Sequence, residues 1–452
     1  MPARLIESLA TTGPLADLFA DQSLLQAMLD FEVGLARAEA QVGVVPPAAA
    51  DAIARVAQAA GIDLAALVRD ALRAGSPSIP FVKALTERVR ASDPSAARFV
   101  HWGATSQDVV DTSLVLILKQ AQPLLETDLA RLEDGLRRLA EQHGNTVVLG
   151  RTLMQAAPPV TFGLKAAGWL GAVRRAGARM KASFGEALVL QFGGASGTLA
   201  SLGEHGPAVG KALARELGLG YPDAPWHTQR DRLAGLVCAC GVLTGSLGKM
   251  ARDISLLMQV EVAEAFEPSG SGRGGSSTMP HKRNPSGCLV ALAAAHRVPG
   301  LVATFLSCMV QEHERALGSW QAEWPTVAGV VQATGVAIAA MAEVAEGLTV
   351  DEARMRANIE ATQGVIFAEK AMMLLGPSLG RDVAHKILEE ATRQSVAQKR
   401  HLVEVLGEMP EIKNHLDPTI LRQLEAPEQY LGAADIFRTS LLARNKTSGN
   451  KE

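Results

Sequence analysis

Apolar residues recur at helical spacing over several unusually long stretches of this sequence, which limits the folds that it can adopt. From about residue 105 or 108 to Gln142, apolar residues recur at helical spacing, with only Pro123 to bend the helix. Roughly 35 residues at 1.5 Å each would make a helix about 50 Å long. Further long stretches of this kind lie at 162–188, 229–266, 289–317 and 327–347. Five long helices with apolar surfaces predict a helical bundle rather than a set of compact layers.

Two of these stretches contain segments without any charge. Residues 233–248 and 326–342 carry no charged side chain, yet both contain glycine, serine or threonine. Both are shorter than the ~20 strongly apolar residues that a membrane span needs. We therefore interpret them as core helices of a large bundle, which several subunits could share.

Shorter helical segments precede and follow the long ones. Residues 21–42 have helical spacing, with Asp21 as the expected N-cap and Gly43 as the stop, and Asp63 is expected to cap a later helix. The segments shorten again after Gly347. We see no repeat and no alternation of strands with helices, so the predicted fold class is all-α. The predicted domains are an N-terminal helical domain (1–112), a central long-helix bundle (113–348) with a loop at 268–288, and a C-terminal helical domain (349–452).

Composition and charge exclude several classes of function. The chain has 452 residues and a formal net charge of -3, so it has no basic footprint for nucleic acid or an anionic membrane. Its four cysteines form no Cys-x-x-Cys pair and are expected to be buried thiols. No cluster has metal-ligand spacing, and we expect neither a metal nor a cofactor. The N-terminus lacks a basic-then-apolar signal, which predicts a cytoplasmic protein.

The segment 270–288 departs from the helical pattern. Its glycines remove side-chain restraint, and Pro280 and Pro285 each remove a backbone donor. A Gly-x-Gly-x-x-Gly pattern at 270–275 matches the dinucleotide fingerprint in letters, but a helix rather than a strand precedes it. Flexibility explains these glycines better, so we expect a mobile loop between two long helices.

Two serines, a lysine and an asparagine follow these glycines in the loop. A solvated surface loop often contains the same residue types. A loop that closes could instead direct a cation and an amide at a carboxylate, which is a familiar catalytic device. The residues concerned are Ser276, Ser277, Lys282 and Asn284.

The segment before the first long helix has three capping residues in close succession. Thr105, Ser106 and Asp108 follow His101, and a simple N-cap explains only one of the three. Free N–H groups at this helix start would attract a carboxylate.

Two more polar stretches have both a structural and a functional interpretation. The small-residue turn 193–198, which includes Ser196, could be ordinary loop packing or a source of anion donors. His313-Glu314-Arg315 is expected in a helix, as an internal ion pair or with Arg315 clamping a carboxylate.

Four stretches together resemble the class II fumarase/aspartase superfamily. Residues 275–285, Gly-Ser-Ser-Thr-Met-Pro-His-Lys-Arg-Asn-Pro, look like its signature loop. Thr-Ser-x-Asp at 105–108, Gly-Arg-Thr-x-x-Gln at 150–155 and His-Glu-Arg at 313–315 fall where its other characteristic regions lie. The resemblance covers essentially the whole chain, including the order of short, long and short helical segments.

The resemblance implies a homotetramer whose active sites are each assembled from three subunits. Its chemistry would be addition to, or elimination across, a double bond beside a carboxylate. Ser276 matches the serine that exchanges the proton next to that carboxylate, with Ser277 as the alternative, and Lys282 would help to lower the serine pKa. The residues expected to bind a small polycarboxylate substrate are His101, Thr105, Ser106, Gln155, Ser196, Lys282, Asn284 and Arg315.

Two departures from the superfamily pattern reduce the number of reactions that this chain could catalyse. Most members place a histidine after Gly-Arg-Thr and a glutamate five residues past the signature asparagine, and here these positions are Leu153 and Leu289. Without this pair, a leaving group or an attacking water lacks proton help, which counts against adenylosuccinate lyase, argininosuccinate lyase and fumarase. A carboxylate within the substrate needs no such help as a nucleophile, because it is already ionised.

The bacterial 3-carboxy-cis,cis-muconate cycloisomerases are the superfamily members that lack this relay, and stretches 101–108 and 313–324 look like theirs. The resemblance implies lactonisation of 3-carboxy-cis,cis-muconate to 4-carboxymuconolactone, in the protocatechuate branch of the beta-ketoadipate pathway. Three alternatives stay open: a substituted substrate such as a sulfonated muconate, an adenylosuccinate lyase-like release of fumarate, and a non-catalytic relative. The sequence leaves open which residue binds which carboxylate.

Overall fold

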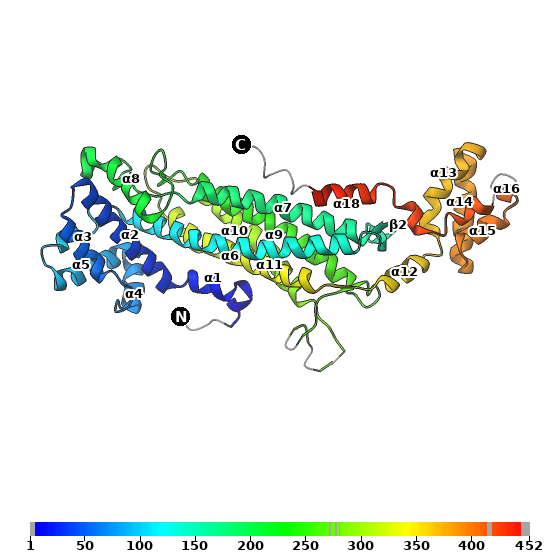
Figure 1. Ribbon diagram of the computed structural model, residues 1–452, viewed down its shortest axis with the longest axis horizontal. Helices are drawn as coiled ribbons and strands as arrows, with labels where there is room; N and C mark the ends of the chain where they lie inside the picture. Colours follow the sequence, from blue (N-terminus) through cyan, green and yellow to red (C-terminus); the bar gives the residue numbers. More distant parts are fainter. Residues whose placement is uncertain (1–4, 271–272, 276–277, 280, 414–417, 444–452) are drawn as a thin grey trace. The chain divides into compact units, whose positions relative to one another are not determined.

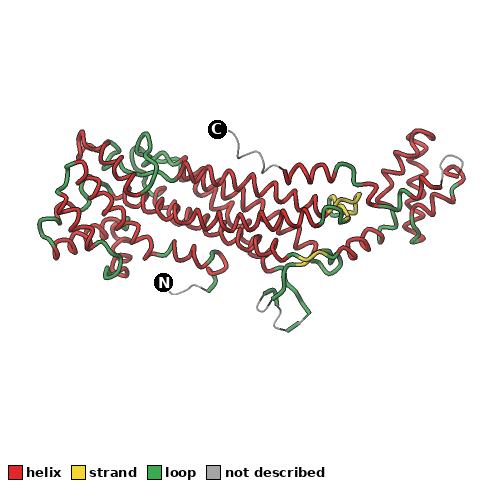
Figure 2. The backbone as a smooth tube through the Cα atoms, viewed as in Figure 1, coloured by secondary structure: helices red, strands yellow, loops and turns green. Residues whose placement is uncertain are grey.

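The chain is almost entirely helical in its computed structural model, which describes residues 5–270, 273–275, 278–279, 281–413 and 418–443 (Figures 1 and 2). The predicted all-α class is therefore confirmed. The α-helices are α1 (Gly13–Leu18), α2 (Asp21–Val42), α3 (Pro47–Val56), α4 (Leu64–Ala74), α5 (Ser78–Ser92), α6 (Ser106–Gln142), α7 (Phe162–Ala187), α8 (Gly206–Leu217), α9 (Asp231–Leu257), α10 (Ser286–Cys308), α11 (Ser319–Gly347), α12 (Glu352–Glu360), α13 (Ala368–Leu379), α14 (Arg381–Gln398), α15 (Leu402–Glu408), α16 (Pro410–Lys413), α17 (Pro418–Arg422) and α18 (Ala434–Ala443). The 3-10 helices are Glu7–Ala10, Ala97–Phe99, Ala200–His205, Val365–Phe367 and Pro427–Tyr430, and the strands are β1 (Val147–Thr152), β2 (Gln155–Thr161), β3 (Ala265–Phe266) and β4 (Thr349–Val350).

The five long helices α6, α7, α9, α10 and α11 lie side by side (Figures 1 and 2). Small residues allow the close approach. A Cβ added to Gly248 of α9 would lie 2.5 Å from the Cβ of Ala295 of α10, and one added to Gly135 of α6 would lie 3.0 Å from the carbonyl carbon of Ala345 of α11. Larger residues at these glycines would push the helices apart.

The predicted end of the third long helix is wrong. Helical periodicity predicted a helix to Phe266, but α9 ends at Leu257. The chain then turns, with Ala263 in the left-handed region at φ 51°, and Ala265 and Phe266 pair with β4 as strand β3. Apolar spacing alone cannot show where a helix gives way to so short a strand.

Two further bounds that differ clearly lie on either side of the His-Glu-Arg stretch at 313–315, and smaller shifts occur elsewhere, such as the start of α10 at Ser286 instead of Leu289. The helix α10 ends at Cys308 instead of Leu317, and α11 begins at Ser319 instead of residue 327. Pro325 lies inside α11 without ending it. Pro325 lies beyond the first turn of α11, where a proline removes an intrahelical hydrogen bond and usually kinks or ends a helix, and it therefore misled the prediction of where this helix begins.

A β-hairpin that the apolar pattern did not predict follows α6. The strands β1 and β2 pair antiparallel, and Thr152 lies opposite Gln155. The two residues between them, Leu153 and Met154, have φ values of 50° and 66°, as a tight two-residue hairpin turn requires. Four successive residues of β1 are buried, so the strand lacks the alternation by which half-buried strands are recognised.

The chain separates into two compact units, each built from three segments. Unit 1 comprises 1–130, 175–248 and 290–340, and unit 2 comprises 131–174, 249–289 and 341–452. The three-domain division stays a prediction, and its boundary at residue 112 falls within α6.

Each unit has a hydrophobic cluster of its own. In unit 1, buried side chains of α2, α3, α5 and α8 pack together, with Phe31 and Phe81 among the largest. In unit 2, the helices α13 to α15 pack against Val147 and Leu149 of β1. The short helices before and after the long ones are thus held mainly by apolar burial.

Three of the long helices have the length and hydropathy of a membrane span, within the part of the chain that the structure describes. They are α9, α10 and α11. In α9 and α11 the chain itself buries 61% of the most apolar window, but in α10 it buries only 22%. The α10 helix therefore presents an apolar surface that its own chain leaves uncovered.

Candidate active site

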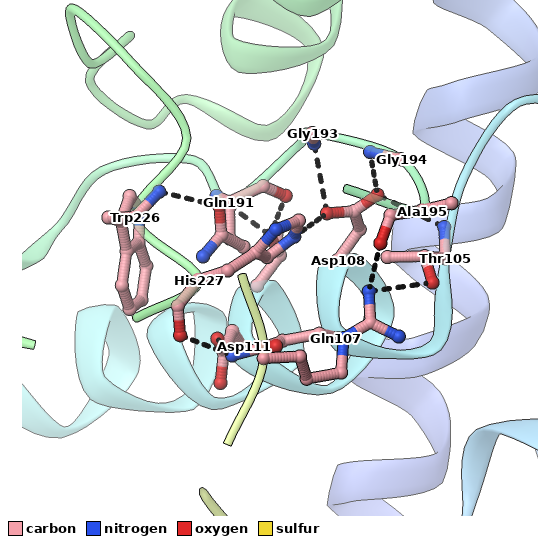
Figure 3. A network of polar contacts seen from close by, with 12 residues as sticks. Thr105, Gln107, Asp108, Asp111, Gln191, Gly193, Gly194, Ala195, Trp226 and His227 are labelled. Atoms are coloured by element: carbon pink, nitrogen blue, oxygen red, sulfur yellow. Dashed lines mark hydrogen bonds and ion pairs between the residues drawn. The ribbon is translucent and has the colours of Figure 1, made fainter. Parts of the chain in front are cut away.

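The start of α6 is held by Asp108, whose carboxylate is fully buried. Its Oδ2 accepts the backbone N–H of Thr105 at 3.0 Å, which satisfies one of the free donors at this helix end (Figure 3). Thr105 itself leaves its hydroxyl free to accept a hydrogen bond from elsewhere. The predicted capping role of this stretch thus belongs to Asp108.

The same carboxylate binds the small-residue turn at 193–198, for which loop packing and anion donors were the two interpretations. The N–H groups of Gly193 and Gly194 each donate to it at 2.9 Å, and Nε2 of His227 lies 2.8 Å from its Oδ1 (Figure 3). Two donors of the turn are therefore occupied by Asp108. Ser196, further along the turn, is exposed.

Arg315 reaches both the start of α6 and this turn. Its Nη2 donates to Thr105 Oγ1 at 3.0 Å and to the carbonyl oxygen of Ala195 at 3.1 Å. The expected helix around 313–315 is wrong: these residues form a turn in which His313 has a φ of 49°. Because Arg315 lies in a turn, its side chain does not point from a helix surface. The buried Nε of Arg315 has no hydrogen-bond partner among the described residues.

The structure thus brings Thr105, Ser106, Ser196 and Arg315 into one neighbourhood of unit 1. Ser106 begins α6 and is half-buried beside Thr105. His101 lies in the turn before α6, and its Nδ1 is 2.7 Å from Oε1 of Glu32. This group combines a guanidinium, an imidazole and hydroxyls, which together suit a substrate carboxylate.

A buried ion cluster that the sequence analysis missed lies behind this neighbourhood. The side chain of Arg230 is fully buried; its Nη1 is 2.7 Å from Asp111, and its Nη2 is 2.6 Å from Glu323. The indole N–H of Trp320 donates to Asp111 at 2.9 Å, and Gln311 donates to Glu323 at 2.7 Å. The two carboxylates raise the pKa of Arg230 despite its burial. The cluster therefore fixes the start of α6 against the start of α11. The only signal for it in the sequence was an acidic residue within an otherwise apolar helix.

The signature loop belongs to unit 2, and its two serines lie outside the described residues. The predicted roles of Ser276 and Ser277 therefore stay predictions. Lys282 is exposed, and its backbone N–H donates to Met279 at 3.0 Å. The side-chain amide of Asn284 donates to the carbonyl oxygen of Gly275 at 3.4 Å, so it contacts the loop backbone itself.

The base of this loop is anchored by Glu267. Its carboxylate accepts the N–H groups of Gly287 at 2.9 Å and Cys288 at 2.7 Å, and so caps the start of α10. Arg283 donates to the carbonyl oxygen of Glu267 at 3.1 Å, while Arg273 pairs with Glu343 at 2.6 Å. The ends of the loop are therefore held even though its centre carries many glycines.

The hairpin carries the two other residues that the resemblance singled out. Gln155 is exposed on β2, and Leu153 at the hairpin tip is 97% exposed. The neighbouring Arg151 forms a bidentate pair with Glu264, at 2.8 and 2.7 Å, and this pair holds its side chain in place. Leu289 stands where most superfamily members have the glutamate of the histidine-glutamate relay, and it is 58% exposed on α10.

The helical fold and the sites described above agree with two protein-family models. A family model described as "Lyase" matches residues 8–300, and one described as "Adenylosuccinate lyase C-terminus" matches residues 364–439. The chain belongs to the lyase family, that is, to the fumarase/aspartase superfamily that the signature loop indicated.

Within that family the chain is similar to several enzymes that carry one name, and to lyases of other names at lower identity. It is 50% identical to the 3-carboxy-cis,cis-muconate cycloisomerase of Bradyrhizobium diazoefficiens, over 93% of this chain and 94% of the relative. It is 48% identical to the enzyme of the same name from Pseudomonas aeruginosa, over 99% and 97%. The crystal structure of the 3-carboxy-cis,cis-muconate lactonizing enzyme from Pseudomonas putida superposes with a TM-score of 0.92 at 46% identity, over 97% and 98%.

Proposed function

We propose that this protein lactonises 3-carboxy-cis,cis-muconate to 4-carboxymuconolactone. The observation that carries the proposal is the high identity, over nearly the full length, to enzymes named for this reaction. Leucines at 153 and 289 support it, because a reaction with an internal carboxylate nucleophile needs no histidine-glutamate relay.

The proposed reaction closes a ring within one substrate molecule. A substrate carboxylate oxygen adds to the double bond conjugated with another carboxylate, and the electron pair moves onto that carboxylate as an enolate-like intermediate. Ser276 then donates a proton to the adjacent carbon and is reprotonated from solvent. The protein lowers the barrier by holding the reacting atoms close together and by stabilising the developing negative charge.

The residues of unit 1 are suited to the carboxylates of this substrate. Arg315 and His101 supply positive charge, while Thr105, Ser106 and Ser196 supply hydroxyl donors. Lys282, Asn284 and Gln155 are the corresponding candidates of unit 2. The expectation that no metal or cofactor takes part stays a prediction, as does the cytoplasmic location.

An ultraviolet assay tests the proposal directly. Purified protein should consume 3-carboxy-cis,cis-muconate and leave adenylosuccinate unchanged, and a sulfonated muconate would measure its tolerance of other substituents. Turnover of adenylosuccinate alone would refute the proposed function. Ser276→Ala should lose lactonisation by several orders of magnitude, with Ser277→Ala as the matched variant that distinguishes the two serines.

We also propose that the protein is a homotetramer built around the long helices. The weakly covered apolar surface of α10 supports this, since Leu289 and Leu306 are 58% and 44% exposed in the single chain. Light scattering should give four times the chain mass of 47.5 kDa. Leu306→Glu should dissociate the assembly, whereas Leu72→Glu, on an exposed face of α4, should leave it intact. A wild-type monomer at micromolar concentration would contradict the proposal.

A further inference from the structure

His101 is held in an uncommon backbone conformation by the turn before α6. Its φ is 59°, in the left-handed region that residues with a Cβ seldom adopt. Its side chain is 17% exposed, and the carboxylate that it contacts, on Glu32 of α2, is 1% exposed. A buried carboxylate at 2.7 Å from Nδ1 is a strong, directional partner.

A second buried glutamate on α2 differs from Glu32 because its carboxylate has no hydrogen-bond partner in the part of the chain that the structure describes. Glu39 lies seven residues further along the same helix, which places it near the same face. It is fully buried, and neither carboxylate oxygen has a hydrogen-bond partner among the described residues. Burial, and after it the negative charge of Glu32, raises the pKa of Glu39 to about 9. Glu39 is therefore protonated at neutral pH.

The charges around His101 favour its cationic form. Burial alone would lower the pKa of His101, but the carboxylate of Glu32, with a further contribution from Asp108, outweighs burial and raises it. The only hydrogen bond to the ring that the described residues supply is the one at Nδ1. Nε2 therefore keeps its N–H for another acceptor.

We propose that Glu32 is a positioning residue: its buried carboxylate fixes the orientation of the His101 ring, so that Nε2–H is presented as a charged donor to a carboxylate of the substrate. This rests on the proposed function, in which His101 binds the substrate. Glu32 reaches the substrate only through His101, in the way that a carboxylate behind a catalytic histidine fixes its ring and tautomer.

Glu32→Gln is the decisive variant, because it keeps the shape and the acceptor oxygen but removes the charge. The KM for 3-carboxy-cis,cis-muconate should rise about tenfold while kcat changes less, as expected for a weakened charge-assisted contact. The alkaline limb of the kcat/KM profile should move to lower pH, because His101 loses the carboxylate that keeps it protonated. In a His101→Gln background, Glu32→Gln should have no further effect on KM.

Glu39→Gln is the matched control on the same helix. Glu39 is already neutral at pH 7, so its replacement should leave KM, kcat and the pH profile unchanged. An unchanged KM and alkaline limb in Glu32→Gln would overturn the proposal, as would equal effects of the two variants. Failure of the proposed function would be distinguishable, because the wild-type protein itself would then not turn over this substrate.

Discussion

The carboxylate of Asp108 and the imidazole of His227 form a buried pair, with Nε2 of His227 2.8 Å from Oδ1 of Asp108. Both residues lie in unit 1, and the same carboxylate binds the backbone of Gly193 and Gly194. One side chain thus joins the start of α6 to the turn that carries Ser196. The candidate substrate-binding groups of this unit, Thr105 and Ser196 among them, depend on that connection for their relative positions.

Asp108→Asn should therefore damage both stability and activity. An amide keeps one acceptor but places a donor against the Gly193 or Gly194 N–H groups, and a buried polar contact of this kind costs about 1–3 kcal/mol. We expect a lower melting temperature and a higher KM for 3-carboxy-cis,cis-muconate. Thermal denaturation and steady-state kinetics measure the two effects. A variant with wild-type KM would show that the turn does not depend on this carboxylate.

Arg230→Met should be among the most destabilising single changes in unit 1. It leaves Asp111 and Glu323 as buried carboxylates without their cation, and loss of one partner from such a cluster costs about 3–5 kcal/mol. Denaturant titration should show the loss. Adding Asp111→Asn and Glu323→Gln should recover part of it, because the remaining groups are then neutral. If the triple variant were less stable than Arg230→Met, uncompensated charge would not be the cause.

The buried Glu39 should make stability fall as pH rises. Its folded-state pKa of about 9 lies above the ordinary glutamate value of 4.5, so between these pH values the folded protein holds a proton that the unfolded chain releases. Stability is therefore fully present below pH 4.5 and is lost by about 1.4 kcal/mol per pH unit until the folded-state pKa is reached. Melting temperatures measured across this range should fall less steeply for Glu39→Gln than for the wild type. Parallel curves would mean that Glu39 is not protonated in the folded protein.

The contact between Gly248 and Ala295 should tolerate no added methyl group. A Cβ on Gly248 would lie 2.5 Å from that of Ala295, whereas one on Gly245, three residues earlier in α9, meets nothing within 4 Å. Gly248→Ala should cost about 1–3 kcal/mol through overpacking. Gly245→Ala is the control and should be neutral or slightly stabilising, because alanine favours the helix. Melting temperatures of the two variants would be compared, and equal values would contradict tight packing at this site.

Much of the helical architecture could be predicted from local pattern. The predicted helix at residues 21–42 coincides with α2, and Gly43 stops it with a φ of 82°. Asp63 caps α4 as predicted, but Asp21 is the first helical residue of α2 instead of its N-cap. Periodicity, glycine stops and capping residues are local signals, and a helix is stabilised by bonds between neighbours in the chain.

The contacts of the candidate site could not be predicted from such local signals. The sequence showed that Thr105, Ser106 and Arg315 were chemically suited to bind a carboxylate, and the signature loop indicated the family. It did not show that Arg315 lies in a turn, or that Asp108 occupies the donors of Gly193 and Gly194.

Local pattern was enough to predict the all-α class, the long helices and the residue types available for chemistry. Which of those residues meet depends on how the helices pack. Arg230 is far from Glu323 in the chain, yet the two form one buried cluster with Asp111. The physical reason is that periodicity reports which face of a helix is apolar, whereas a hydrogen bond or an ion pair between distant segments depends on how those segments pack.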